Sequence, residues 1–550
     1  MQLTPSAHAD TFCRDHLPPA DQWPEMEFTL PELAYPDRLN CARALLADTI
    51  AAHGADRPCL LPQDASQPVW SYDDLALTAS KVARALTDDL GLVPGNRVLL
   101  RGPNNPWMVA CWFGVLLAGG VVVATMPLLR AAELATICDI AQVSLALCDD
   151  RFTGELAAAG VPGLRIVPFR EGPPPRGGEV NEAPGDSLNQ LMSRKPGTFD
   201  HVETAADDVA IIAFTSGTTG RPKAAMHFHR DILAIADTFS RHVLKPVPDD
   251  VFTGTPPLAF TFGLGAIVIF PIRAGASALL IERATPAELA DIIADRGVTV
   301  VSTAPTAYRA MLAAGKAEQL KGLRRPVSAG ETLPASVWHA FHDATGVKII
   351  DGIGSTELLH IFISAADEQI RPGATGLPVP GYRAQVVNGG GQPVPDGMPG
   401  RLAVKGPTGC RYLADDRQKN YVSGGWNFTG DTYVRDADGY FWYQARSDDM
   451  IVSSGYNIAG PEVEDVLLTH PDVTECGVVG VPDEGRGQIV KAFVVLADGV
   501  PAGPEKAAEL QDLVKSKIAP YKYPRAVEFL PSLPRTNTGK LQRYKLREMP

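Results

Sequence analysis

The feature that most constrains the fold of this 550-residue chain is a long alternation of short apolar runs and amphipathic stretches. Runs rich in β-branched residues, such as "NRVLLRG", "VVVAT" and "VTVVSTAP", are separated by stretches such as "DDLALTASKVARALTDDL" and "TPAELADIIADRG". These stretches place apolar residues at helical spacing, with Asp or Thr near the start. Strands that alternate with helices form parallel sheets with helices on both faces. We therefore expect an α/β fold whose ligands bind beyond the carboxyl ends of the strands.

The chain is too long for one hydrophobic core, so we expect more than one domain. The segment "VNGGGQPVPDGMPGRLAVKG" has hairpin turn chemistry and predicts a small β-rich subdomain near residues 380–445. After "ARSDDMIVSSGYNIAG" the alternation restarts in a compact α+β unit. We predict a large domain over 1–447, with two parallel αβ-layered sheets plus the β-rich subdomain, followed by a small mobile domain over 448–550.

Composition excludes several classes of protein. The formal net charge of −13 and the lack of a basic tract exclude a nucleic-acid partner. The eight cysteines include no CxxC pair, which indicates reduced thiols and a cytoplasmic location. Residues 107–129 carry no charge and are long enough to span a bilayer. Because Gly119 and Gly120 divide this segment into a helix-like half and the β-branched half "VVVAT", we predict a buried helix followed by a buried strand, with no membrane span.

The segment "TSGTTGRPK" directly follows the apolar run "VAIIAF" and predicts a phosphate-binding loop. Its glycines let an anion approach the backbone, its hydroxyl and amide groups donate hydrogen bonds, and its lysine adds a positive charge. It is not the common P-loop, because only two residues separate its glycines and Ala224 follows the lysine. The candidate phosphate-binding residues are Thr215, Ser216, Gly217, Thr218, Thr219, Gly220 and Lys223.

"TSGTTGRPK" resembles the phosphate loop of the adenylate-forming superfamily, which includes acyl- and aryl-CoA synthetases, luciferases and the adenylation domains of peptide synthetases. Five further motifs follow in the order of that family, and together they cover nearly the whole chain. They are "SAGETLP" (328–334), "DGIGSTELLHIF" (351–362), "GGWNFTGD" (424–431), "ARSDDMIVSSGYNIAGPEVE" (445–464) and "PRTNTGKLQR" (534–543). The resemblance implies ATP, Mg²⁺ and coenzyme A as cofactors, a small carboxylic acid as substrate, and a monomer or a homodimer.

The resemblance also implies roles for individual residues. Glu357 would hold the Mg²⁺ of MgATP, as suits a hard oxygen ligand, and Thr356 would contact the α-phosphate. Asp431 and Arg446 would bind the ribose, although Ala445 stands where the family has glycine. Lys540 would bridge the attacking carboxylate and the ATP phosphates, and Asp448 would be the hinge between the domains. The further nucleotide-binding candidates are Gly330, Glu331, Asp351 and Gly352, and those for coenzyme A are Ser454, Gly455 and Tyr456.

The identity of the acid is the least constrained point. The segment "PPLAFTFGLG" (256–265) lacks the Asp with which amino-acid-activating relatives pair an α-ammonium group, which disfavours an amino acid. "DGIGSTELLHIF" resembles the benzoate-CoA and 2-aminobenzoate-CoA ligase branch, which would place His360 at the base of the acid pocket. The pocket candidates are Phe260, Thr261, Phe262, Ala329, Gly354 and His360. By spacing alone the two phenylalanines are as compatible with ordinary core, and His227 and His229 are interpreted as structural residues.

We expect an AMP-forming aryl-CoA ligase for 2-aminobenzoate or benzoate. A medium-chain or branched acyl-CoA ligase on the same scaffold is an alternative, because the sequence does not show the depth of the pocket. A second alternative is a non-catalytic nucleotide- or acyl-adenylate-binding protein. Loss of Lys223, Glu357 or Lys540 would be expected of such a protein, yet all three are present.

Overall fold

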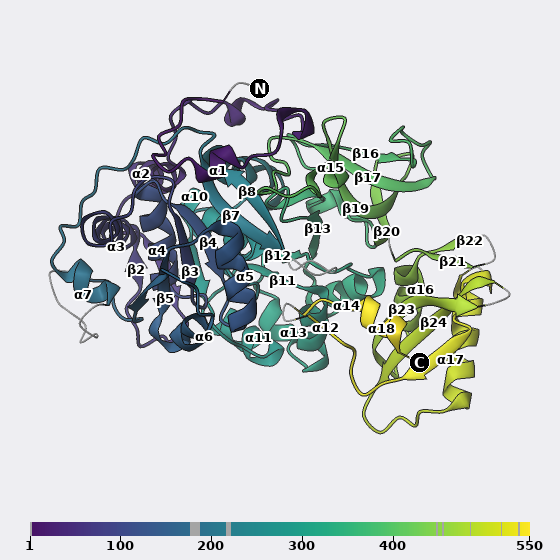
Figure 1. The fold of residues 1–550 in the computed structure, drawn as a ribbon. Coiled ribbons are helices and arrows are strands. Elements are labelled where there is room, and N and C mark those ends of the chain that lie inside the picture. Colours follow the sequence, from purple (N-terminus) through teal and green to yellow (C-terminus); the bar gives the residue numbers. More distant parts are fainter. Residues whose placement is uncertain are drawn as a thin grey trace.

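The computed structural model describes residues 3–175, 187–215, 222–446, 449–453, 456–483, 486–518, 520–536 and 539–549. These residues form a large N-terminal domain and a small C-terminal domain (Figure 1). The large domain contains two mainly parallel sheets and a smaller antiparallel sheet. The α/β architecture predicted from the alternation is therefore confirmed.

One of the mainly parallel sheets has six strands, and the pair of strands at one of its two edges is antiparallel. In spatial order the strands are β6 (Arg165–Phe169), β5 (Leu145–Asp149), β3 (Arg97–Arg101), β4 (Val121–Thr125), β7 (Val209–Thr215) and β8 (Lys223–Phe228). The seven residues 216–222 between β7 and β8 are too few for the crossover that a parallel pair requires, so β8 returns antiparallel to β7.

The other large sheet has nine strands, and the third to the eighth of them in spatial order are parallel. In that order the strands are β15 (Leu377–Pro378), β14 (Ile361–Ser364), β13 (Ile350–Gly354), β12 (Arg325–Ser328), β11 (Val300–Thr303), β9 (Val251–Gly254), β10 (Ser277–Leu280), β1 (Pro58–Pro62) and β2 (Trp70–Ser71). One continuous buried cluster contains side chains from both large sheets and from the helices packed on them. The two sheets therefore share a core, which fixes their carboxyl ends relative to each other.

Helices cover both sheets and begin and end at the residues that their sequences indicate. The longer ones are α2 (Cys41–His53), α3 (Tyr72–Arg84), α4 (Pro106–Leu117), α5 (Ala131–Ala141), α11 (Pro286–Asp295), α12 (Pro305–Ala313) and α14 (Ala335–Thr345). Ser71 and Asp74 form a capping box at the start of α3, and Thr285 and Glu288 form one at the start of α11. Helix α14 ends at Gly346, whose φ of 75° suits glycine.

Shorter helices complete the large domain: α1 (Phe12–Asp15), α6 (Thr153–Ala158), α7 (Leu188–Ser193), α8 (His229–Ile235), α9 (Thr261–Leu264), α10 (Phe270–Arg273), α13 (Ala317–Leu320) and α15 (Gln418–Tyr421). The uncharged segment predicted as a buried helix and strand is α4 followed by β4. Every residue of α4 is buried, and β4 lies between β3 and β7. Among the described residues, no helix combines the length and hydropathy that a bilayer span requires.

The β-rich subdomain is a five-stranded antiparallel sheet beside the two large sheets (green in Figure 1). Its strands are β16 (Arg383–Val387), β17 (Pro399–Lys405), β18 (Val422–Ser423), β19 (Trp426–Arg435) and β20 (Phe441–Arg446).

The small domain (yellow-green in Figure 1) has its own sheet and its own hydrophobic core. It consists of β21 (Ile451–Ser453), β22 (Tyr456–Ile458), α16 (Gly460–Leu467), β23 (Val473–Asp483), β24 (Gly487–Leu496), α17 (Pro504–Lys517), β25 (Ala526–Phe529) and α18 (Arg543–Glu548). In Figure 1 the yellow segment that precedes α18 reaches from this domain toward α12 and α14 of the large domain. The predicted boundary near Asp448 stays a prediction, since that residue lies outside the described part of the chain.

Candidate active site

The predicted phosphate loop connects β7 to β8 at the end of the six-stranded sheet. Thr215 ends β7, Lys223 begins β8, and the two residues pair across the hairpin. The loop residues Ser216, Gly217, Thr218, Thr219 and Gly220 lie outside the described residues, so their assignment stays a prediction. The described ends of the loop place Lys223 beside a second sequence-predicted residue, Glu357.

Lys223 and Glu357 meet at the hydroxyl of Tyr412. The Lys223 Nζ donates to the Tyr412 hydroxyl at 3.2 Å, and that hydroxyl donates to Glu357 Oε1 at 2.5 Å. Tyr412 is fully buried, and burial beside the Glu357 carboxylate raises the pKa of its phenol. The phenol therefore stays protonated, and its hydroxyl links the Lys223 ammonium group on β8 to the Glu357 carboxylate in the segment after β13. Sequence reasoning missed Tyr412, because no local motif pairs it with residues 357 and 223.

Backbone hydrogen bonds hold Tyr412 against β8. The Met226 N–H donates to the Arg411 carbonyl at 2.8 Å, and the Leu413 N–H donates to the Ala224 carbonyl at 2.9 Å. Arg411 is itself fully buried, where it forms an ion pair with Asp231 and lies over the Phe228 ring, 3.9 Å from its centroid. A buried ion pair in this place fixes the loop, because either charge alone would be strongly disfavoured there.

The buried histidines His227 and His229 both have structural partners. His227 Nε2–H donates to the Thr356 carbonyl at 2.8 Å, which holds the residue before Glu357. Burial, together with the nearby Arg411 charge, lowers the pKa of His227 to about 3, so the ring is neutral. His229 Nδ1 accepts from the Cys41 N–H at 3.2 Å. Their interpretation as structural residues is therefore confirmed.

Asp431 and Arg446 form the predicted ribose end of the site. They are direct partners in the antiparallel pair β19–β20, and Arg446 Nη1 donates to Asp431 Oδ1 at 3.1 Å and to the Thr429 carbonyl at 3.0 Å. Burial raises the pKa of Asp431, and the Arg446 charge opposes that change. Ala445, which stands in place of glycine, is a buried residue of β20 without a positive φ, and it lies next to a register shift in the β19–β20 pair, between Thr432 and Tyr433.

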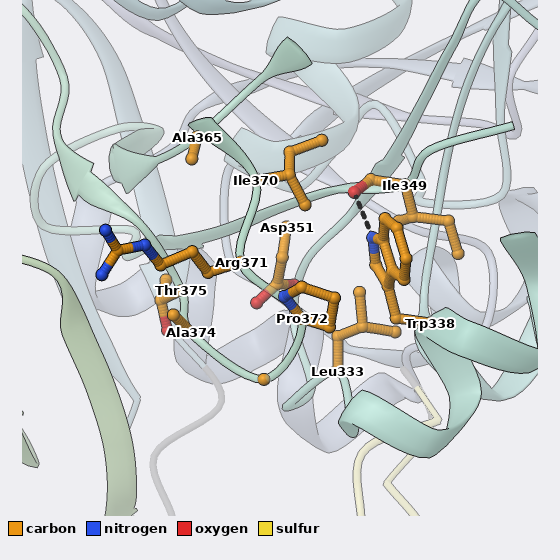
Figure 2. A pocket seen from close by; sticks show the side chains of 11 residues that line it. Leu333, Trp338, Ile349, Asp351, Ala365, Ile370, Arg371, Pro372, Ala374 and Thr375 are labelled. Atoms are coloured by element: carbon orange, nitrogen blue, oxygen red, sulfur yellow. Dashed lines mark hydrogen bonds between the residues drawn. The ribbon is translucent and has the colours of Figure 1, made fainter. Parts of the chain in front are cut away.

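The further predicted nucleotide-binding residues lie directly after β12 and within β13. Ala329 and Gly330 follow β12, and the φ of Gly330 is +88°, a conformation that favours glycine. Gly352 packs closely on β14, because a Cβ at this position would approach the Ile361 side chain to 2.8 Å. Asp351 borders a small cavity with Leu333 and Pro372 (Figure 2). Burial raises the pKa of Asp351 to about 8, so it is a neutral acid at neutral pH.

Lys540 approaches these groups from the small domain. A Cβ on Gly330 would lie 3.9 Å from Lys540 Cε, so the lysine side chain extends over the loop after β12. Lys540 is accessible to water, yet the surrounding protein desolvates it enough to lower its pKa, and the Arg446 charge acts in the same direction. The carboxylates of Asp431, Glu331 and Glu357 oppose that change. Lys540 therefore belongs to the same electrostatic neighbourhood as the predicted nucleotide-binding residues.

The hinge and coenzyme A candidates of the small domain are described only in part. Asp448, Ser454 and Gly455 lie outside the described residues, and Tyr456 begins β22. Their roles stay predictions.

The predicted acid pocket centres on His360, which is 3% exposed and surrounded by aromatic rings. The ring centroids of Phe270, Phe239 and Phe262 lie 4.6, 5.6 and 5.7 Å from that of His360. His360 Nε2–H donates weakly to the Phe262 carbonyl at 3.4 Å. Burial lowers the pKa of His360 to about 3, so the imidazole is neutral. A neutral ring walled by phenylalanines suits a flat apolar group.

The other pocket candidates lie on the neighbouring segments. Phe260 directly precedes α9 and is half-buried, whereas Thr261 is buried within that helix. Gly265 packs against His360 so closely that a Cβ would meet the imidazole Cδ2 at 2.3 Å. Leu359, beside His360, has a φ of +71°, which is strained for a bulky residue. The motif thus combines a strained turn with glycine contacts, as occurs at binding sites.

The described residues fit a metal that arrives with a nucleotide. They include no group of three or more His, Cys, Asp or Glu side chains arranged to hold a metal ion. Mg²⁺ that is bound to phosphates and water needs only one or two protein carboxylates, and Glu357 is the residue predicted to supply one. Lys223 and Lys540 are the cations predicted to face phosphate groups in the same neighbourhood.

Comparison with known proteins agrees with this arrangement. Residues 46–412 match the AMP-binding enzyme family, and residues 462–540 match the AMP-binding enzyme C-terminal domain. The benzoate–CoA ligase of Thauera aromatica is 35% identical, over 94% of this chain and 98% of its own.

Two solved structures are also similar. That of the anthranilate CoA ligase AuaEII in complex with anthranoyl-AMP has a TM-score of 0.87 at 34% identity and covers 94% of this chain and 98% of its own. That of a benzoate CoA ligase from Burkholderia xenovorans LB400 has a TM-score of 0.83 at 30% identity and covers 92% and 100%. The chain therefore belongs to the AMP-binding enzyme family and is an AMP-forming acyl- or aryl-CoA ligase that uses ATP and coenzyme A.

Proposed function

We propose that this ligase activates an aromatic carboxylic acid, 2-aminobenzoate or benzoate, and transfers it to coenzyme A. The acid carboxylate attacks the α-phosphate of ATP and releases pyrophosphate, and the thiol then displaces AMP from the aryl-adenylate. The products are aryl-CoA, AMP and pyrophosphate. The observation that carries the proposal is the aromatic cluster of the neutral His360 with Phe239, Phe262 and Phe270, in which Phe262 stays partly exposed, since such a cluster suits the wall of a pocket for a flat ring.

Both partners of the first step are anionic, so catalysis depends on positioning and charge neutralisation. Lys223 and the phosphate loop hold the β- and γ-phosphates, and Thr356 holds the α-phosphate. Glu357 would hold the Mg²⁺ that accompanies ATP, and that ion would neutralise phosphate charge. Lys540 bridges the attacking carboxylate and the phosphates, which fits its position over Gly330.

The proposal also assigns the nucleoside contacts. The Asp431 carboxylate accepts hydrogen bonds from the ribose hydroxyl groups, and Arg446 on the neighbouring strand orients that carboxylate. Gly330, Glu331, Asp351 and Gly352 line the base, where the protonated Asp351 offers both a donor and an acceptor.

The second step uses the small domain differently. Rotation about Asp448 withdraws Lys540 and brings Ser454, Gly455 and Tyr456 to the pantetheine of coenzyme A. The relatives support the aromatic acid, because they include ligases named for benzoate and for anthranilate, which is 2-aminobenzoate. The lack of an acidic residue in 256–265 supports the exclusion of amino acids.

The test is pyrophosphate release with 2-aminobenzoate, benzoate and octanoate, each with and without coenzyme A. Steady release that depends on coenzyme A and favours the aryl acids is expected, and it would also rank them. Glu357→Gln is the control, because release that survives in this variant does not come from this site. A preference for octanoate would replace the aryl proposal with an aliphatic acyl ligase. Release with none of the acids would contradict the proposed function.

A further inference from the structure

Arg535 of the "PRTNTGK" motif joins three parts of the molecule. Its Nη1 lies 3.0 Å from Glu331 Oε1 in the large domain, and its Nη2 lies 2.8 Å from Glu475 Oε2 in β23 of the small domain. The same Nη1 donates to the Gly539 carbonyl at 2.7 Å, directly before Lys540. The side chain is 27% exposed and that of Glu331 is 17% exposed. This geometry uses the rigid fork of a guanidinium, which a lysine ammonium cannot reproduce.

The turn that carries Lys540 is otherwise held by local hydrogen bonds. The Thr536 N–H donates to the Lys540 carbonyl at 2.8 Å, and the Lys540 N–H donates to Thr536 Oγ1 at 3.1 Å. These bonds shape the turn but do not connect it to the large domain. Arg535 makes that connection at the loop after β12, over which Lys540 extends.

Two further contacts join the domains. Ser336 Oγ donates to Asp465 Oδ1 at 2.7 Å between α14 and α16, and Arg309 Nη2 donates to the Val473 carbonyl at 2.6 Å. These contacts also orient the small domain, and the second lies on β23, two residues before Glu475. Arg535 differs because one side chain contacts both domains and the turn itself.

We propose that Arg535 is a positioning residue for adenylate formation, which holds the Lys540 turn over the nucleotide site by bridging Glu331 and Glu475. Its pairing with Glu331 also occupies a carboxylate that would otherwise compete with the nucleotide phosphates for Lys540. The ion pair lies at a partly exposed surface, so domain rotation can break it. The role of Arg535 in adenylate formation rests on the proposed function, whereas its role as a bridge between the two domains does not depend on that function.

The structural part is tested by the rate at which a disulfide forms between the domains. The pair Ser336→Cys/Asp465→Cys places two thiols at positions whose side chains touch in this arrangement. Seven of the eight native cysteines are buried, which keeps the background low. Adding Arg535→Ala is expected to slow cross-linking about tenfold, since the arrangement loses a charge-assisted contact. Arg525→Ala is the matched control, because Arg525 is also half-buried in the small domain but contacts Tyr523 of that domain.

The catalytic part is tested by measuring the two half-reactions separately. Arg535→Ala is expected to lower pyrophosphate release about ten- to a hundredfold, and Arg535→Lys to lower it less. Thioester formation from supplied aryl-adenylate should change by less than about twofold, because Lys540 acts only in the first step. The Arg525→Ala control should leave both half-reactions near the rates of the unaltered protein.

The outcomes separate the two claims. Slower cross-linking with a selective loss of adenylation supports the assignment. Unchanged cross-linking or unchanged adenylation overturns it, and so does an equal loss in both half-reactions, which indicates general damage. If the unaltered protein adenylates none of the acids, the proposed function fails, and cross-linking alone still decides whether Arg535 holds the domains in this arrangement.

Discussion

The large-domain and small-domain parts of the site are built by different forces. Tyr412 and Arg411 are fully buried behind Glu357 and Lys223, on a loop that backbone hydrogen bonds fix to β8, and the partner of Arg411, Asp231, is fully buried in α8. Lys540 and Arg535 lie on a partly exposed turn that the Arg535–Glu331 ion pair connects to the large domain. Buried groups are costly to separate, whereas partly exposed ion pairs contribute little to stability. The comparison fits the proposed division of the site into a fixed half for the phosphates and a movable half that completes the site for a single step.

The largest expected effect comes from breaking the fixed half at its buried ion pair. Asp231→Asn leaves Arg411 buried without a counter-charge and should lower the free energy of unfolding by about 3–5 kcal/mol. Glu475→Gln also removes the carboxylate partner of an arginine, but at a partly exposed site, and should cost less than about 1 kcal/mol. Urea denaturation of both variants measures the difference. Similar losses in the two variants would show that burial does not distinguish the two halves.

A smaller effect is expected when the fixed half loses one hydroxyl. Tyr412→Phe keeps the ring but removes the group between Lys223 and Glu357, and should slow pyrophosphate release about tenfold. Thioester formation from supplied adenylate should stay within about twofold of the unaltered protein. Tyr421→Phe removes a buried hydroxyl that contacts Ser355 at 3.1 Å and serves as the control, with a loss below about threefold. Equal losses in the two variants would show that the Tyr412 hydroxyl contributes no more to pyrophosphate release than another buried hydroxyl nearby.

The smallest effect concerns how stability depends on pH in the fixed half. Burial lowers the pKa of His227 from 6.5 to about 3, so protonation below 6.5 favours the unfolded chain. The stability that neutral His227 provides is therefore complete above about pH 6.5 and decreases as the pH falls toward 3. Between about pH 7.5 and pH 5.5 this single group should remove about 1.4 kcal/mol from the free energy of unfolding.

His227→Gln keeps a donor for the Thr356 carbonyl but has no titrating ring. Urea denaturation measures the free energy of unfolding at the two pH values. Its change between them should be smaller in the variant than in the unaltered protein by about 1.4 kcal/mol. The same change in both proteins would mean that His227 becomes protonated in the folded state.

The sequence predicted the elements and the order of the site motifs, because both depend on local patterns. Helix α11 begins at the capping box of Thr285 and Glu288, and the buried pair α4 and β4 follows from the two halves of one apolar segment. The residues placed together by the structure, such as Glu357, Asp431 and Lys540, each lie in a motif that could be recognised.

The connections between motifs could not be predicted, since they depend on tertiary contacts. Tyr412 joins positions 223 and 357 through a loop with no signature of its own. Arg535 lies in a recognised motif, yet its two carboxylate partners are 204 and 60 residues away. The raised pKa of Asp351 arises from burial, which the sequence "DGIG" does not show. Sequence thus indicated which groups take part, and packing determined how they are held.

The most direct test of the two-part site is to measure both half-reactions in Lys540→Ala. The fixed half still binds ATP and the acid in this variant, whereas the movable half has lost its cation. Pyrophosphate release should fall by about a hundredfold or more, as on removal of a preorganised charge partner, while thioester formation from supplied aryl-adenylate should keep its rate. An equal loss in both half-reactions would contradict the division of the site into a fixed half and a half that serves one step.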